Sequence, residues 1–243
     1  MNSKNKISII DNIKTLIYAV LIAFFIRTFI LQPFTIPSGS MLPNLLIGDY
    51  LFVSKYSYGY SRYSLPFSPN IFQDRVFDKQ PKRGDVVVFR LPRDPSVDYI
   101  KRVIGLPGDE IVIENGLIYI NDGLIEQSQN IDTDKYLSIF PTSSLITEKI
   151  SDRSYTVMSL ENNAIGDNTG IYIVPENHYF FMGDNRDNSL DSRFVDQVGT
   201  VPFENLIGRA EFLFFSSDKS IPLWKVWRWH KKFRVDRIFK KIK

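Results

Sequence analysis

The stretch YIKRVIGLPGDEIVIENGLIYI, residues 99–120, decides the fold class. Residues 111–114 and 117–120 are β-branched runs that flank Asn115-Gly116, and this pair suits the type I′ turn of a tight hairpin. Residues 99–104 are predicted to form another short strand, and Pro107-Gly108 after it suits a type II turn. Three strands joined by tight turns predict an antiparallel sheet.

Strand patterns continue on both sides of this stretch. The runs at 86–89, 171–174 and 179–182 are rich in β-branched or aromatic residues. Residues 124–170 are polar and weakly patterned, and their strands are uncertain. We therefore predict a mainly β protein of twisted antiparallel sheets. Its body is expected to comprise residues 35–112 and 179–215, with an inserted β lobe at 113–178.

Composition excludes several classes of site. The 243 residues are 44% hydrophobic and 23% charged, which is typical of a folded domain. Cysteine is absent, which excludes disulfides, thiolate metal sites and cysteine nucleophiles. The two histidines, His178 and His230, are too few for a multi-histidine zinc site. Neither metal-ligand spacing nor a glycine-rich phosphate loop occurs, so we expect no metal and no cofactor.

The N-terminal region has the length of a membrane anchor. Residues 16–34 are nineteen residues in which Arg27 is the one charge, close to the roughly 20 needed to cross a bilayer. Three lysines precede the segment and the next lysine after it is Lys55, which places the tail 1–15 in the cytoplasm and the body outside. The alternative is a cleaved signal peptide, with Ser38-Gly39-Ser40 as the cleavage site. The lysines before the segment are Lys4, Lys6 and Lys14.

The C-terminal tail, residues 216–243, carries the basic character of the chain. Residues 225–243 contain nine Lys or Arg and one Asp, a net charge of +8. Because the whole chain has a net charge of +3, the remaining residues carry −5. Four apolar residues fall on one helical stripe, which suits an amphipathic helix on a membrane surface. A solvated, frayed end is the alternative, and nucleic-acid binding is disfavoured for a domain outside the cell. The stripe consists of Val235, Ile238, Phe239 and Ile242.

A candidate nucleophile follows the anchor in Ile36-Pro37-Ser38-Gly39-Ser40-Met41-Leu42-Pro43. A serine nucleophile needs a base, and neither histidine has suitable neighbours. Lysine can act as the base when it is neutral. Lys101 shares a strand face with Tyr99 and Val103, and burial there would lower its pKa from about 10.4 by the roughly 2 to 3 units that this role requires. A third segment, residues 183–193, is rich in hydrogen-bonding side chains.

Together these segments resemble the type I signal peptidase family. The resemblance covers the anchor, the serine segment and residues 50–59, 83–89, 98–109 and 183–193 in the same order. It implies that Ser40 is the nucleophile and Lys101 the general base. Ser38 and the backbone N–H of Ser40 would form the oxyanion hole, and Ser189 would orient the lysine. The residues implied as a charged scaffold are Arg102, Asp184, Asp191 and Arg193.

The resemblance also implies the substrate and the location. The chain would be a membrane-bound serine endopeptidase that removes signal peptides from secretory preproteins at Ala-X-Ala-like sites. It would span the bacterial inner membrane once, contact membrane lipid and work on the outer, periplasmic face. Shallow apolar pockets would admit small residues and exclude bulky ones. Their walls would be Phe34, Ile36, Pro37, Met41, Leu45, Leu51, Val88, Tyr99 and Ile100.

Three features depart from the family pattern. Asn44 stands where threonine is common, there is one span where some members have two, and the lobe after Leu124 has no recognisable counterpart. Two other function classes are alternatives. A self-processing Ser–Lys protease of the repressor type needs a DNA-binding domain where the anchor lies. A non-enzymatic membrane protein with a lipid-binding tail makes the serine and lysine motifs accidental.

Overall fold

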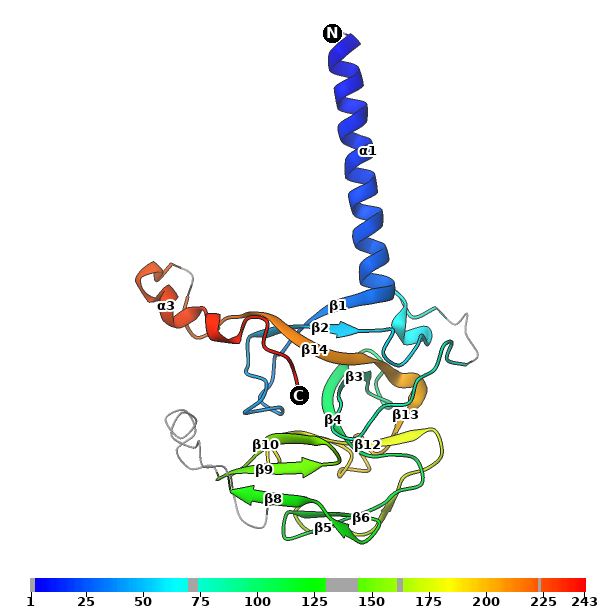
Figure 1. Ribbon diagram of the computed structural model, residues 1–243, viewed down its shortest axis with the longest axis vertical. Coiled ribbons are helices and arrows are strands. Elements are labelled where there is room, and N and C mark those ends of the chain that lie inside the picture. Colours follow the sequence, from blue (N-terminus) through cyan, green and yellow to red (C-terminus); the bar gives the residue numbers. More distant parts are fainter. Residues whose placement is uncertain (1–2, 70–73, 130–143, 161–163, 223) are drawn as a thin grey trace.

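A long N-terminal helix projects from a β-rich body (Figure 1). This computed structural model describes residues 3–69, 74–129, 144–160, 164–222 and 224–243. Helix α1, Ser3–Phe25, continues into a π-helical turn η1, Ile26–Ile30. The apolar stretch Ile9–Ile30 has a mean hydropathy of 2.0 and is long enough to cross a membrane.

The helix ends four residues before the predicted end of the anchor at residue 34. Strand β1, Leu31–Thr35, begins there instead and pairs with β2, Asp49–Ser54. Pro33 explains the difference, because proline lacks the N–H that a helix requires and restricts the preceding residue to extended conformations. The anchor is therefore joined directly to the sheet.

The body is one curled antiparallel sheet of seven strands. Its other strands are β3, Val86–Arg90; β4, Asp98–Gly105; β12, His178–Met182; β13, Val201–Pro202; and β14, Leu206–Ser216. The order is β1-β2-β14-β3-β4-β12-β13. Register shifts where β14 meets β2 and β3 bend the sheet, as bulges do. The strands predicted at 86–89, 99–104 and 179–182 are confirmed.

The described part of the lobe contains two smaller sheets. Strands β5, Glu110–Glu114; β6, Leu117–Ile120; β7, Gly123–Leu124; and β11, Tyr172–Ile173, form one in the order β11-β5-β6-β7. Strands β8, Glu126–Gln129; β9, Ser144–Ile150; and β10, Arg153–Ser159, form the other. Asn115 and Gly116 have φ of 50° and 77°, as the predicted hairpin turn requires. Residues 130–143 and 161–163 of the predicted lobe lie outside the described residues.

The lobe boundary predicted at residue 113 falls inside a strand. Strand β5 lies entirely in the lobe sheet, so the lobe begins at the turn after Gly105. The lobe nevertheless shares a buried core with the body. Ile104 and Phe180 of the body pack with Ile111 and Val157 of the lobe. The lobe thus supports the strands β4 and β12 that carry the site.

The tail does not form the predicted helical stripe. It contains three short helical turns, η4, Val226–Arg228; α3, Trp229–Lys232; and η5, Val235–Arg237. The remaining short turns are η2, Arg62–Ser64, and η3, Phe203–Asn205. Arg237 forms a buried ion pair with Asp49 at 2.5 Å, and Leu213 N–H donates to the Lys240 carbonyl at 2.9 Å. These contacts hold the last residues against β14 and prevent one continuous amphipathic helix.

Candidate active site

The serine segment forms a tight turn after β1. Leu42 N–H donates to the Gly39 carbonyl at 3.1 Å, and Ser40 at its centre is 9% exposed. Asn185 holds this turn from the opposite side. Its backbone N–H donates to the Ser40 carbonyl at 3.1 Å, and its Nδ2 donates to the Gly39 carbonyl at 3.0 Å. The position of Ser40 is therefore set by hydrogen bonds to the backbone carbonyls of the serine turn.

Lys101 reaches this turn from β4. Its Nζ lies 2.5 Å from Ser40 Oγ, and the side chain is 4% exposed. Nζ is 5.4 Å from the centroid of the Tyr99 ring, on the strand face that side-chain alternation predicts. Burial lowers the pKa of Lys101 to about 8, against the opposing effect of the Asp191 and Asp184 carboxylates. The predicted serine and lysine are thus adjacent, and the pKa of the lysine lies well below its usual value.

Arg102 points to the other side of β4 and pairs with Asp184. Its Nε and Nη2 donate to the two carboxylate oxygens at 2.7 Å each, and both side chains are 1% exposed. Its Nη1 donates to the backbone carbonyls of Gly84 and Lys243, both at 2.8 Å. The guanidinium also lies 3.8 Å from the centroid of the Tyr155 ring. This satisfied pair ties β4 to the loop after β12.

A second buried pair shapes that loop. Arg193 Nε donates to Asp191 Oδ1 at 2.9 Å, and Asp191 Oδ2 accepts from the Gly183 N–H at 3.0 Å. The loop is also tied to the lobe by the buried pair of Arg186 and Glu148, in which Nη1 donates to Oε1 at 2.6 Å. This last pair was not predicted from the sequence, because its partners lie far apart along the chain.

Gly183 allows the loop after β12 to pack closely against the serine turn. A Cβ atom there would lie 2.1 Å from Ser189 Oγ and 2.5 Å from the Ser40 carbonyl oxygen, closer than real Cβ atoms come to other heavy atoms. Ser189 is 4% exposed, and its Oγ has no hydrogen-bond partner among the described residues. The predicted bond from Ser189 to Lys101 is therefore not formed here, since the hydroxyl faces Gly183.

A cleft of about 660 Å³ opens beside Ser40 and Lys101. Ser38 lies at its edge, with its Oγ 3.5 Å from Ser40 Oγ. Six of the predicted wall residues line the cleft: Phe34, Ile36, Pro37, Val88, Tyr99 and Ile100. The lining residues that were not predicted are Pro33, Thr35, Val97, Asp98, Asn188 and Leu190.

Three predicted wall residues lie elsewhere. Met41, Leu45 and Leu51 are at most 1% exposed and belong to the core cluster beneath the serine turn. None of the three lines the cleft, whereas Ile36 and Val88 of the same cluster do. They support the site without contacting its cavity.

The family model described as signal peptidase, peptidase S26, matches residues 9–215. Signal peptidase I of Rickettsia typhi is 42% identical to this chain, with 99% of the chain and 97% of the relative covered. That of Rickettsia prowazekii is 43% identical, with 93% and 90% covered. The chain belongs to the signal peptidase I family. It is therefore a serine endopeptidase that removes signal peptides from secretory preproteins.

Among solved structures, a signal peptidase I from Enterococcus faecalis V583 is similar to this chain. It is 27% identical, has a TM-score of 0.34, and the match covers 54% of this chain and 97% of that one.

Asn44, where this signal peptidase departs from the family pattern, belongs to the site's support. Its Nδ2 donates to Asp184 Oδ2 at 2.7 Å and to the Thr156 carbonyl at 2.6 Å. One amide nitrogen supplies both donors, whereas a threonine hydroxyl has a single proton. Asn44 therefore joins the serine segment, the Arg102 pair and the lobe.

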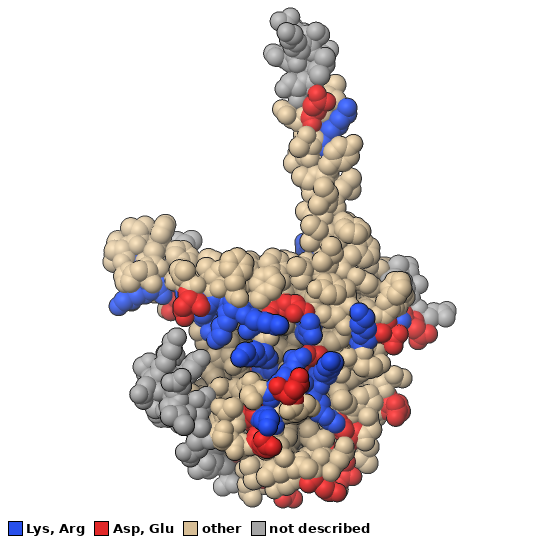
Figure 2. All heavy atoms as spheres, viewed as in Figure 1, with Lys and Arg blue, Asp and Glu red and all other residues tan. Residues whose placement is uncertain are grey.

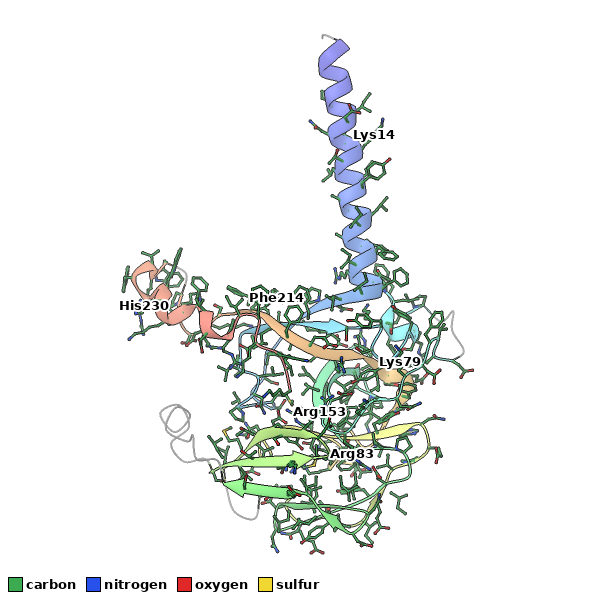
Figure 3. The ribbon with its side chains drawn as sticks, in the orientation of Figure 1. Lys14, Lys79, Arg83, Arg153, Phe214 and His230 are labelled. Carbon is green, nitrogen blue, oxygen red and sulfur yellow. The ribbon has the colours of Figure 1, made fainter. Side chains whose placement is uncertain are left out.

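Neither histidine of this signal peptidase contacts Ser40. His178 Nδ1 lies 2.9 Å from the Glu176 carbonyl oxygen. His230 lies in α3 of the tail (Figure 3), and α3 lies away from β4 (Figure 1). Within the described ranges, no group of three or more His, Cys, Asp or Glu side chains is arranged to hold a metal ion.

Proposed function

We propose that this signal peptidase works through a Ser40–Lys101 dyad. The observation that carries the proposal is the 2.5 Å separation of Lys101 Nζ and Ser40 Oγ, together with the lowered pKa of the lysine. Neutral Lys101 takes the Ser40 proton as Oγ attacks the scissile carbonyl carbon, and gives it to the leaving amine. A water activated by Lys101 then hydrolyses the acyl-enzyme. Cleavage of a secretory precursor by the wild type, and its loss in Lys101→Ala, tests this.

Stabilisation of the oxyanion is assigned to Ser38 and the Ser40 backbone N–H. Ser38 Oγ is close to the nucleophile, at 3.5 Å from Ser40 Oγ, and lines the same cleft. Donors aimed at the developing negative charge stabilise the transition state more than the substrate. The four scaffold residues, Arg102, Asp184, Asp191 and Arg193, hold these groups in place.

Ser38→Ala is expected to lower kcat by about 10²- to 10³-fold with little change in KM, since the lost donor acts in the transition state. Ser38→Thr keeps the hydroxyl and should have a smaller effect. Steady-state kinetics on a precursor peptide measure both. An unchanged kcat for Ser38→Ala would reduce Ser38 to a turn residue.

Specificity for Ala-X-Ala-like sites is supported by the shape and chemistry of the cleft. In an extended peptide, the residue before the cut and the one two positions earlier face the same side. That side would meet apolar walls such as Ile36, Val88 and Ile100. Precursors with leucine in place of either small residue should resist cleavage, and equal rates would contradict the assignment.

Anchoring in the inner membrane is supported by the surface around the helix. The edge of the body from the tail to the base of α1 consists largely of uncharged residues (Figure 2). Phe214 on β14 lies on that side (Figure 3), with its ring centroid 4.4 Å from that of Phe52. Trp224 and Trp227 are 74% and 68% exposed. Aromatic side chains of this kind partition to the membrane interface, so lipid is the second proposed partner.

The anchor should place the N-terminus in the cytoplasm and the body on the periplasmic side. A reporter fused after Lys243 is therefore expected to be active only outside the cytoplasm, since lysines precede the span and are absent just after it. Protease digestion of spheroplasts should likewise remove the tail. A protected tail would reverse the orientation and separate the enzyme from its substrates.

A further inference from the structure

A second cavity lies where the anchor joins the body. It has a volume of about 320 Å³ and none of its lining residues lines the substrate cleft. Its walls come from the end of the anchor, from β1, β3 and β14, and from the segment after β2, which lies beside the base of α1 (Figure 1). Tyr60 of that segment donates to the Phe29 carbonyl at 2.7 Å, and Lys55 N–H donates to the Ile30 carbonyl at 3.1 Å.

The cavity is strongly cationic. Arg27, Lys55 and Arg90 line it, and no Asp or Glu does among the described residues. Lys55 is 3% exposed, and its Nζ donates to the Ser64 carbonyl. In the part of the chain that the structure describes, neither Arg27 nor Lys55 forms an ion pair with a carboxylate, whereas Arg90 Nε lies 3.2 Å from Asp98 Oδ1.

Such an arrangement is unfavourable without an anion. A buried ammonium lacking a counter-charge costs considerable free energy. Consistent with this, burial lowers the pKa of Lys55 to about 8, and the nearby charges of Arg27 and then Arg90 act in the same direction. An anion in the cavity would remove this cost and make charge-assisted hydrogen bonds.

The position of the cavity indicates where its anion comes from. Arg27 lies in η1, within the last residues of the candidate span Ile9–Ile30. Phe24, one helical turn deeper, also lines the cavity, and Phe67 at its mouth is fully exposed. Cations beside apolar side chains at the end of a span match the level of lipid phosphates.

We propose that this cavity binds the phosphate group of an anionic phospholipid. Arg27, Lys55 and Arg90 supply positive charge, and Gln32 and Tyr63 supply neutral donors. The proposal rests on the membrane anchoring proposed above. The site also adjoins the substrate cleft, because Asp98, the partner of Arg90, lines that cleft. Bound lipid would therefore help to set the height of the cleft above the membrane.

The test is retention of phosphatidylglycerol by the full chain purified in detergent, measured by lipid titration and native mass spectrometry. Arg27→Gln/Lys55→Met is compared with the wild type and with Lys79→Gln, a matched loss of an exposed lysine on the body. Phosphatidylcholine is the neutral-lipid arm, and inorganic phosphate is added as a competitor. Cleavage of a short peptide in detergent is followed in parallel.

We expect the double variant to bind phosphatidylglycerol about 30-fold more weakly, since it lacks two interfacial cations that each contribute on the order of 1 kcal/mol. Lys79→Gln and peptide cleavage should be unchanged. Arg27→Gln alone should also weaken binding of phosphatidylglycerol. This single variant still tests the site if the substitution of buried Lys55 disturbs folding. Equal retention of both lipids by all variants would overturn the proposal, as would inorganic phosphate that binds with the same affinity as the lipid.

One further outcome would also overturn the lipid assignment. If Arg27→Gln slowed only precursors with an acidic residue near the cut, equally in phosphatidylcholine and phosphatidylglycerol vesicles, the cavity would be a peptide subsite. Ser40→Ala should abolish peptide cleavage and leave lipid retention intact. Failure of the proposed Ser40–Lys101 dyad and failure of the proposed lipid site would therefore give different results.

Discussion

Lys101→Arg and Lys101→Ala are expected to lower kcat/KM for a secretory precursor by about 10⁴-fold. The base must give up its proton to accept that of Ser40, and an arginine guanidinium does not do so at any pH the protein tolerates. Ser40→Ala should be equally inactive, because nucleophile and base act as one unit and their losses do not add. The measurement is steady-state or single-turnover cleavage with purified full chain.

Lys79→Arg serves as the matched control, since Lys79 is exposed and does not line the cleft. Its kcat/KM should equal that of the wild type. Substantial turnover by Lys101→Arg, or by Ser40→Ala, would assign the chemistry to other residues.

Asp184→Ala is expected to lower the free energy of unfolding by about 3 to 5 kcal/mol. It leaves the Arg102 guanidinium, 1% exposed, without its carboxylate in the interior. It also removes one of the two acceptors of Asn44 Nδ2, so the serine segment loses a hydrogen bond to the loop after β12. Thermal or denaturant unfolding in detergent measures the change.

The exposed pair of Lys149 and Glu126 provides the comparison. Their charged atoms are 3.3 Å apart, with side chains 55% and 74% exposed. Glu126→Ala should therefore cost about 1 kcal/mol or less. If Asp184→Ala were as mild as Glu126→Ala, the buried pair would not be a support of the site.

Local sequence signals predicted the strands well. Asn115-Gly116 determines its turn through the residues' tolerance of positive φ, and the predicted strands at 86–89 and 99–104 are strands largely buried on both faces. The alternation of side chains also placed Lys101 and Arg102 on opposite faces of β4. The proximity of Ser40 and Lys101, 61 residues apart, came from the family resemblance, because spacing alone cannot bring two distant segments together.

What the sequence could not predict depends on long-range contacts. Asn44 and Asn185 donate hydrogen bonds to backbone carbonyls of other segments. Because every residue has a backbone carbonyl, residue types do not reveal which carbonyl accepts such a bond. The tail has the pattern of an amphipathic helix, yet the Arg237 ion pair and the hydrogen bonds to β14 override that local preference. The family resemblance implied that Met41 belongs to the cleft wall, and sequence alone does not distinguish an apolar residue beside a cleft from one beneath it.

The most direct test of the dyad is the pH dependence of kcat/KM for the wild type, His178→Ala and His230→Ala. Because Lys101 must be neutral, activity should rise about tenfold per pH unit below the lysine pKa and level off above about 8 in all three proteins. If instead either histidine variant lost several orders of magnitude while Lys101→Arg stayed active, a serine–histidine mechanism would replace the one proposed.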